Sequence, residues 1–189
     1  MDAASLCGQV TALLADKGLR RLDEPIELAS GAMSDAFVDG KLALAEAADL
    51  LLAGRAVAAL TGEAGIDVDA VGGLTMGADA LAVAAAAALD CRWFLVRKAA
   101  KERGTGRLIE GARLGPGDRV LVLDDVITTG GSLLQAVDAV IGTGATVVAA
   151  TTLLDRGDTA AGLLRDRGIA YLPIATYREL RIAPVVPPS

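Results

Sequence analysis

The stretch of sequence that decides the fold reads Val120-Leu121-Val122-Leu123-Asp124-Asp125-Val126-Ile127-Thr128-Thr129-Gly130-Gly131-Ser132. Its four leading apolar residues are typical of a strand that is buried on both faces of a parallel sheet. Two adjacent carboxylates follow, and a loop rich in hydroxyls and glycines then opens a helix. The order predicts a strand–loop–helix unit whose polar groups lie at the carboxyl end of the strand. Ligands bind at that edge in open α/β sheets.

The loop 128–132 has the features of a phosphate site. Gly130 and Gly131 let backbone amides approach an anion, the neighbouring hydroxyls can donate hydrogen bonds, and the helix amino terminus adds partial positive charge. Carboxylates repel phosphate, so Asp124 and Asp125 suit vicinal hydroxyls or a hydrated Mg²⁺ instead. Together these features predict a sugar-phosphate site, and the alternative is an ordinary acidic turn. The pattern is neither a Walker A loop nor Gly-x-Gly-x-x-Gly.

Segments with helical and strand patterns alternate along the rest of the chain, with a hairpin-like region at 26–41 around Ser30-Gly31 and an extended tail from Ala183. Expected helices cover 3–17, 45–61, 78–89, 132–142 and 158–167, and expected strands cover 70–73, 93–96, 120–123, 146–153 and 170–174. This alternation predicts a single α/β domain over residues 1–189, with a central, mainly parallel sheet flanked by helices.

Composition limits the class of protein. The chain has 189 residues, of which 53% are hydrophobic, 22% charged and only 3% aromatic, so we expect a globular core of aliphatic residues with closely packed helices. The net charge of −6 argues against nucleic acid or an anionic membrane as a partner. No signal-peptide pattern or membrane span is visible, and Cys7 and Cys91 match no metal or redox spacing. A soluble, cytoplasmic protein is expected.

The chain contains no histidine. This excludes Ser-His-Asp and Cys-His nucleophile activation, zinc sites with histidine ligands, and a general base whose ordinary pKa lies near neutrality. Any catalysis must therefore depend on carboxylates, Lys, Arg, hydroxyls, backbone amides or a bound metal.

A second segment, 97–110, is polar, longer than most connections and a candidate mobile loop. Five basic residues fall between positions 97 and 107, and the one acid among them is Glu102. The basic residues are Arg97, Lys98, Lys101, Arg103 and Arg107. In an acidic protein, such a concentration of cations suits the clamping of a highly charged anion such as diphosphate. The alternative is a solvated charged loop.

These segments resemble a known family. The run 124–132 resembles the 5-phosphoribosyl-1-diphosphate (PRPP) signature of type I phosphoribosyltransferases. The segment 97–111 resembles the mobile loop of orotate phosphoribosyltransferases, Arg-Lys-x-x-Lys-x-His-Gly-x-x-x-Leu-Ile-Glu-Gly, except that Arg103 occupies the histidine position. The stretch 71–79 resembles the family's diphosphate loop, with Met76 where many members have Lys.

Two further segments of the chain resemble parts of the same family. The stretch 28–39 is similar to the family's hood, with Ala29 where many members have Lys. The sequence 153–157 resembles the Asp-Arg pair after the fourth strand, in which the Arg, here Arg156, meets the orotate carboxylate. A surface ion pair with Asp155 or Asp158 is the alternative for this arginine.

The resemblance implies a type I phosphoribosyltransferase fold with a small N-terminal hood at about 20–42. It implies transfer of the phosphoribosyl group from PRPP to N1 of orotate, giving orotidine 5′-monophosphate and diphosphate. Mg²⁺ would be held mainly by PRPP, with no direct protein ligand, and a homodimer would share the mobile loop across subunits. Two alternatives remain: a phosphoribosyltransferase for another nucleobase, and a non-catalytic regulator that senses PRPP.

The resemblance also implies roles for individual residues. Lys101, Arg103, Asp124 and Asp125 would be catalytic, the first two at the departing diphosphate and the last two at the ribose hydroxyls. PRPP would also be bound by Arg97, Lys98, Val126, Ile127, Thr128, Thr129, Gly130, Gly131 and Ser132. Orotate would be bound by Thr128 and Arg156.

Overall fold

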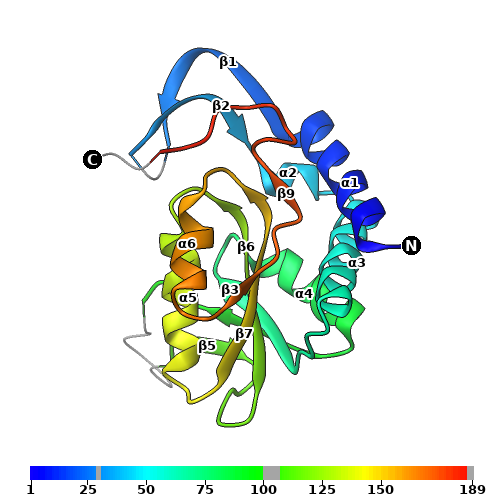
Figure 1. Ribbon diagram of the computed structural model, residues 1–189, viewed down its shortest axis with the longest axis vertical. Helices are drawn as coiled ribbons and strands as arrows, with labels where there is room; N and C mark the ends of the chain where they lie inside the picture. The colour runs from blue at the N-terminus through cyan, green and yellow to red at the C-terminus, as the bar shows by residue number, and fades with distance from the viewer. Residues whose placement is uncertain (29–30, 100–106, 187–189) are drawn as a thin grey trace.

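The structure, a computed structural model, describes residues 1–28, 31–99 and 107–186 (Figure 1). In these ranges the sheet has the strand order β5-β4-β3-β6-β7-β8, with β9 also paired to β7. All neighbours are parallel except β5, which runs antiparallel to β4. The strands are β3 (Ala70–Leu74), β4 (Arg92–Val96), β5 (Ile109–Gly111), β6 (Arg119–Ile127), β7 (Thr146–Asp155), β8 (Ala170–Tyr171) and β9 (Ala175–Thr176).

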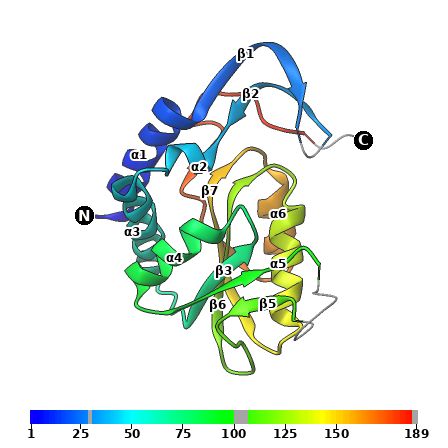
Figure 2. The ribbon, with the colours of Figure 1, turned by 180° about the vertical axis from the view of Figure 1, so that it is seen from behind.

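Helices cover both faces of the sheet, as Figures 1 and 2 show. One face is covered by α1 (Ala3–Leu13), α3 (Ala47–Glu63) and α4 (Asp79–Leu89), and the other by α5 (Gly131–Ile141) and α6 (Thr159–Arg165). Helix α1 continues into a π-helical turn, η1 (Leu14–Gly18), and the short α2 (Gly40–Ala43) follows the N-terminal strands. The predicted α/β architecture is thus confirmed. No helix in the described ranges combines the length and hydropathy needed to cross a bilayer.

The central strand β6 is buried on both faces, as its apolar run predicted. Val120 and Val122 belong to the core beneath α5 and α6, whereas Leu121 and Leu123 belong to the core beneath α1, α3 and α4. All four side chains are fully buried. This alternation shows that β6 lies between the two layers of helices. The carboxyl end of β6 lies at the edge of the sheet where ligands bind in open α/β folds.

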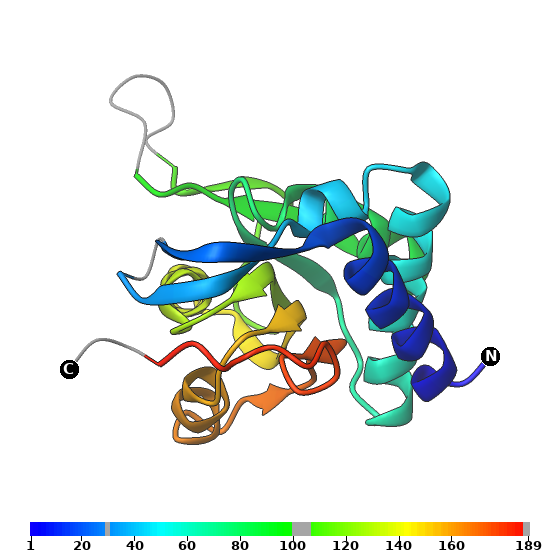
Figure 3. The same ribbon diagram turned by 90° about the horizontal axis from the view of Figure 1, so that it is seen from above.

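A two-stranded antiparallel hairpin lies above that edge (Figures 1 and 3). It consists of β1 (Leu19–Glu27) and β2 (Met33–Val38), so the expected hairpin is present but its first strand begins earlier than predicted. Asp39 then caps α2, because its carboxylate accepts a hydrogen bond of 2.9 Å from the Leu42 backbone N–H. We call β1 and β2 together the hood.

Three further elements differ from the sequence-based expectation. Strand β6 extends through Ile127, because β7 pairs with it as far as Asp155, so the two carboxylates lie within the strand and not after it. The edge strand β5 was not predicted, since three residues carry too little periodicity to be recognised. The expected strand at 170–174 is instead two short strands, β8 and β9.

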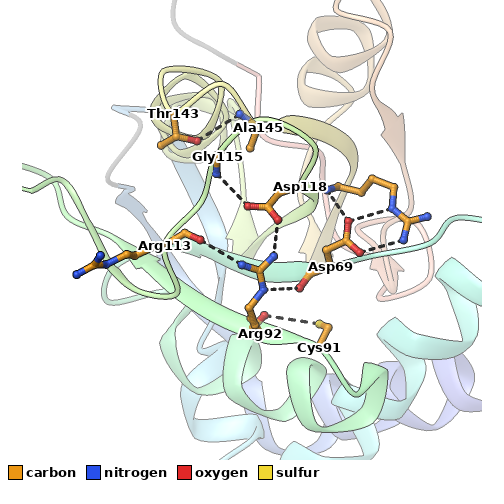
Figure 4. Close-up of polar contacts among 9 residues, drawn as sticks. Asp69, Cys91, Arg92, Arg113, Gly115, Asp118, Thr143 and Ala145 are labelled. Carbon is orange, nitrogen blue, oxygen red and sulfur yellow. Dashed lines mark hydrogen bonds and ion pairs between the residues drawn. The ribbon is translucent and has the colours of Figure 1, made fainter.

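The opposite edge of the sheet is held by an ionic network (Figure 4). The Arg92 guanidinium donates to the backbone oxygens of Asp69 and Arg113 and pairs with Asp118 at 2.5 Å. Arg119 donates to both carboxylate oxygens of Asp69, at 2.9 and 3.0 Å. These contacts hold the amino-terminal ends of β3, β4 and β6 together. The ligand-binding edge lies at the opposite ends of these strands.

Helices α3 and α4 pack closely, as an alanine-rich core requires. A Cβ atom added at Gly54 would lie 2.5 Å from the carbonyl oxygen of Ala84. By contrast, a Cβ at Gly62, in the same helix, would meet no atom within 4 Å.

Gly54→Ala should therefore destabilise the protein, because the two helices must separate. We expect a loss of about 1–3 kcal/mol in the free energy of unfolding. The control Gly62→Ala should leave stability unchanged or raise it by up to ~1 kcal/mol through its better helix propensity. Urea denaturation followed by circular dichroism measures both. Equal stability of the two variants would contradict the close contact between α3 and α4.

Candidate active site

A cavity of about 640 Å³ lies between the hood and the carboxyl end of β6. This volume is within the ordinary range for small-molecule sites. Residues 124–132 and Arg156 line the cavity together with Leu28 and 37–41. The structure thus brings the predicted sugar-phosphate residues together with the hood and with Arg156.

The two carboxylates are held by the backbone around them. Asp124 is only 6% exposed, and one of its oxygens accepts a hydrogen bond of 2.9 Å from the Asp125 N–H. Asp125 in turn accepts from the Val126 N–H at 2.8 Å, and the Thr152 hydroxyl donates to the Asp125 carbonyl. Burial first, and then repulsion by Asp125, raise the pKa of Asp124 to about 7. A ligand that donates hydrogen bonds or carries positive charge would relieve this crowding of negative charge.

The loop 75–77, which follows β3, lies against both carboxylates. A Cβ at Gly77 would come within 2.6 Å of the Oδ1 atoms of Asp124 and Asp125, so only glycine allows this approach. The loop is anchored by the Thr75 N–H, which donates to the Val96 carbonyl at 2.8 Å. The predicted diphosphate loop is therefore next to the predicted ribose site. Met76 is 76% exposed.

The loop from β6 to α5 has the backbone conformation that the glycines predicted. Gly130 is the N-cap residue of α5 and has a φ of +86°, in the left-handed region that favours glycine. Its carbonyl accepts the Leu134 N–H at 2.9 Å, which begins the helix. Because Thr128, Thr129 and Ser132 line the cavity beside this helix terminus, an anion there could receive both amide and hydroxyl hydrogen bonds.

Lys41, in α2, is a site residue that the sequence did not reveal. Its ammonium donates to Asp125 Oδ2 at 2.8 Å, and this hydrogen bond is the main reason that the pKa of Lys41 is raised. Close packing of α2 on the sheet allows the contact, since a Cβ at Gly40 would lie 3.1 Å from Leu153. The only local signal was the position of Lys41 just after the hood and its capping residue Asp39.

Arg156 connects the sheet to the hood. Only 2% of this residue is exposed, and its terminal nitrogens donate to the Ala36 carbonyl at 2.8 Å and to the Ser34 hydroxyl at 3.0 Å. Burial lowers the pKa of the guanidinium. Its Nε has no hydrogen-bond partner among the described residues. Arg156 therefore lines the cavity and also holds the hood in position above it.

The alternative that Arg156 forms a surface ion pair with Asp155 or Asp158 is wrong. Asp158 pairs instead with Arg178 at 2.9 Å, and one oxygen of Asp155 accepts the Gly157 N–H at 3.1 Å. The adjacency in sequence was misleading, because the side chain of Arg156 turns inward to the hood.

The basic segment is described only in part. Lys101 and Arg103 lie outside the described residues, so their predicted contacts with diphosphate stay predictions. Arg97 pairs with Glu110 at 2.9 Å, and the Lys98 carbonyl accepts a hydrogen bond from Gln135 at 3.2 Å. Neither Arg97 nor Lys98 is among the described residues that line the cavity.

The raised pKa of Asp124 makes a prediction about stability. The ordinary carboxyl pKa of 3.8 applies to the unfolded chain and about 7 to the folded chain, so folded protein binds more protons between these values. The contribution of Asp124 to the free energy of unfolding is therefore most favourable below pH 3.8, and it is lost as the pH rises through 7. Asp124→Asn should raise the free energy of unfolding by about 1–3 kcal/mol at pH 8, and this gain should shrink toward pH 5.

Thermal unfolding of both proteins from pH 5 to pH 8 measures this difference. Asp138→Asn removes an exposed carboxylate of α5 that pairs with Arg167, and comparison of the two variants separates the effect of burial at Asp124 from the general effect of losing one negative charge. If the increase in the free energy of unfolding caused by Asp124→Asn does not depend on pH, the surroundings do not raise the pKa of this carboxyl.

Comparisons with known proteins agree with this geometry. Residues 44–168 match the model of the phosphoribosyl transferase domain. The chain is 47% identical over 141 residues to orotate phosphoribosyltransferase from Streptomyces avermitilis, covering 72% of this chain and 76% of the relative. It is 40% identical over 171 residues to the Streptomyces coelicolor enzyme of the same name, covering 87% and 91%.

A solved structure supports the same grouping. The crystal structure of Mycobacterium tuberculosis orotate phosphoribosyltransferase in complex with PRPP superposes with a TM-score of 0.76 at 33% identity, covering 93% of this chain and 99% of that one. This confirms the type I phosphoribosyltransferase fold. The chain belongs to the orotate phosphoribosyltransferases, within the phosphoribosyltransferase family.

Proposed function

We propose that this protein transfers the 5-phosphoribosyl group from PRPP to N1 of orotate, forming orotidine 5′-monophosphate and diphosphate in pyrimidine biosynthesis. One observation carries the proposal. Two crowded carboxylates and a glycine-rich helix terminus face one cavity, whose roof is the hood and whose wall includes Arg156. The relatives' names and the PRPP complex of the mycobacterial enzyme support it.

PRPP fits this cavity by charge. The 5′-phosphate would bind to the amides and hydroxyls of 128–132, at the positive end of α5. The ribose hydroxyls would donate to Asp124 and Asp125, which need hydrogen-bond donors. The C1′–O bond to diphosphate breaks, with its electron pair leaving on the diphosphate, as the N1–C1′ bond forms on the opposite face through a cationic ribosyl centre, and the N1 proton passes to solvent water. The protein then has to position the reactants and place charge, and no histidine is required for either.

Orotate would lie beneath the hood and beside Arg156, with Thr128 close to it. The guanidinium of Arg156 gives this part of the cavity a fixed positive charge, which suits the orotate carboxylate. Because two of its nitrogens already bind β2, the position of the hood and the position of the orotate site are coupled.

The departing diphosphate would be bound by Lys101 and Arg103, and PRPP also by Arg97 and Lys98. Where the family pattern has imidazole, Arg103 has a guanidinium that keeps its charge at all physiological pH values. This residue should therefore contribute no titration near pH 6 to 7 to the kinetics.

The proposal includes Mg²⁺, which would bind together with PRPP. Asp124 and Asp125 line the cavity, and carboxylates suit contact with a hydrated Mg²⁺. PRPP oxygens and water would hold the ion, with these carboxylates nearby. The bound ion would neutralise part of the diphosphate charge.

We also propose that the enzyme is a cytoplasmic homodimer in which the segment 97–110 of one subunit reaches the site of the other. The free thiols of Cys7 and Cys91 are consistent with a reducing compartment. The described ends of this segment lie at one side of the sheet, where β5 is the outermost strand and β4 is its neighbour, and this position is consistent with the proposed sharing.

Incubation with PRPP, Mg²⁺ and orotate should consume orotate, and ultraviolet absorbance follows the reaction. Hypoxanthine, adenine and uracil are the matched substrates and should not react. Turnover of one of these bases without turnover of orotate would assign another nucleobase. Binding of PRPP without any turnover would assign a regulator instead.

Lys101→Ala should lower kcat by about a hundredfold while weakening the ground-state binding of PRPP much less, because the lost charge acts on the leaving group. Steady-state kinetics and PRPP titration measure the two effects separately. An unchanged kcat would remove Lys101 from the mechanism.

Mixing Asp125→Asn chains with Lys101→Ala chains should restore part of the activity if the loop works across the dimer. A mixed dimer would then contain one site with both residues intact. Verified heterodimers that recover no activity would contradict loop sharing.

A further inference from the structure

The described lining of the cavity has two cations, Lys41 and Arg156. Arg156 is buried and its terminal nitrogens are bound to the hood. Lys41, by contrast, has a side chain that is 60% exposed and a single partner, Asp125, whose side chain is 19% exposed. Of these two cations in the described lining, Lys41 is the one that can change partners.

Lys41 also lines a second hollow. This space of about 340 Å³ lies beside α2 and the loop 75–77, and Gly40, Lys41 and Asp125 line both it and the main cavity. Met76 and Gly77 line the second hollow too. Lys41 thus stands between the sugar-phosphate site and the loop that follows β3.

An anion beside this loop would meet little positive charge from the loop itself. Residues 75–79 are Thr-Met-Gly-Ala-Asp, so the loop supplies amides but no cationic side chain. The nearby carboxylates Asp124 and Asp125 would repel the anion, because Gly77 packs directly on them. A ligand with a diphosphate group there needs a neighbouring cation, and Lys41 is in place to supply it.

We propose that Lys41 is an exchangeable counterion: it neutralises Asp125 in the free protein and moves to the diphosphate of PRPP when PRPP binds. The move leaves Asp125 free to accept hydrogen bonds from the ribose hydroxyls. This inference rests on the proposed function, since it takes PRPP as the ligand.

The exchange keeps both charges compensated. The Lys41 side chain is 60% exposed, so water can solvate its ammonium during the move, and the ribose hydroxyls then donate hydrogen bonds to Asp125, whose side chain is only 19% exposed. The α2 backbone is fixed by the Asp39 cap and by the packing of Gly40, so only the lysine side chain has to move. Its long stem and compact ammonium suit such a change of partner.

The test compares Lys41→Met with Lys41→Arg, using calorimetric titration with three probes. PRPP carries the 5′-phosphate, the ribose hydroxyls and the diphosphate, whereas ribose 5-phosphate lacks the diphosphate and inorganic diphosphate lacks the sugar. In the presence of Mg²⁺, Lys41→Met should weaken the binding of PRPP and the binding of inorganic diphosphate about tenfold each, as expected for a lost charge-assisted hydrogen bond. Ribose 5-phosphate should bind as in the wild type or more tightly. Lys41→Arg should restore most of the PRPP affinity.

Lys17→Met is the matched control, because Lys17 also forms a partly exposed ion pair, with Asp49 at 2.5 Å, but does not line the cavity. It should leave all three affinities unchanged, and thermal unfolding should show that every variant is folded. Equal weakening of PRPP and ribose 5-phosphate by Lys41→Met would mean that Lys41 only orients Asp125, and would overturn the proposal. Unchanged PRPP binding would overturn it as well.

Failure of the proposed function has a different signature, which is that the wild-type protein either does not bind PRPP or binds it without consuming orotate. A wild type that binds PRPP, beside a Lys41→Met variant that also binds it fully, overturns the counterion role alone.

Discussion

The adjacent carboxylates at the end of β6 are the constraint around which the site is arranged. Asp124 is buried beside Asp125, and neither can move without disturbing a strand that is packed on both faces. The chain limits the resulting repulsion with backbone donors and with Lys41. Because anions are repelled here, the proposed phosphate site lies further along the chain, at the amino terminus of α5. In the proposed function, this separation of the site for hydroxyls from the site for phosphate selects a phosphorylated sugar.

The hood completes the site through one buried contact. Arg156 follows β7 but donates its hydrogen bonds to Ser34 and Ala36 in β2. A cation of this kind is costly to bury without partners, so the hood and the sheet are held in a defined relation. In the proposed function, the base would enter the space beside this contact, while the sugar and phosphate would bind to β6 and the loop after it. Selection of the base and binding of the sugar would then depend on different elements of the chain.

Much of this arrangement could be predicted from the sequence because it depends on local order. The buried run before Asp124 indicated a central strand, and Gly130 indicated the left-handed turn into α5. Contacts between distant segments could not be predicted. Lys41 reaches Asp125 across 84 positions and Arg156 reaches Ser34 across 122, and neither contact leaves a periodic signal. Strand β5 was missed because an edge strand of three residues depends on its partner, not on its own pattern.

The central claim is that the cavity beneath the hood is the place where PRPP binds, with its ribose on the carboxylates and its 5′-phosphate on the helix terminus. A crystal structure of this protein with PRPP and Mg²⁺ tests that claim most directly. The account predicts the 5′-phosphate within hydrogen-bonding distance of residues 128–132 and the ribose hydroxyls on Asp124 and Asp125. A phosphate bound elsewhere, or a ribose whose hydroxyls do not contact these carboxylates, would contradict it.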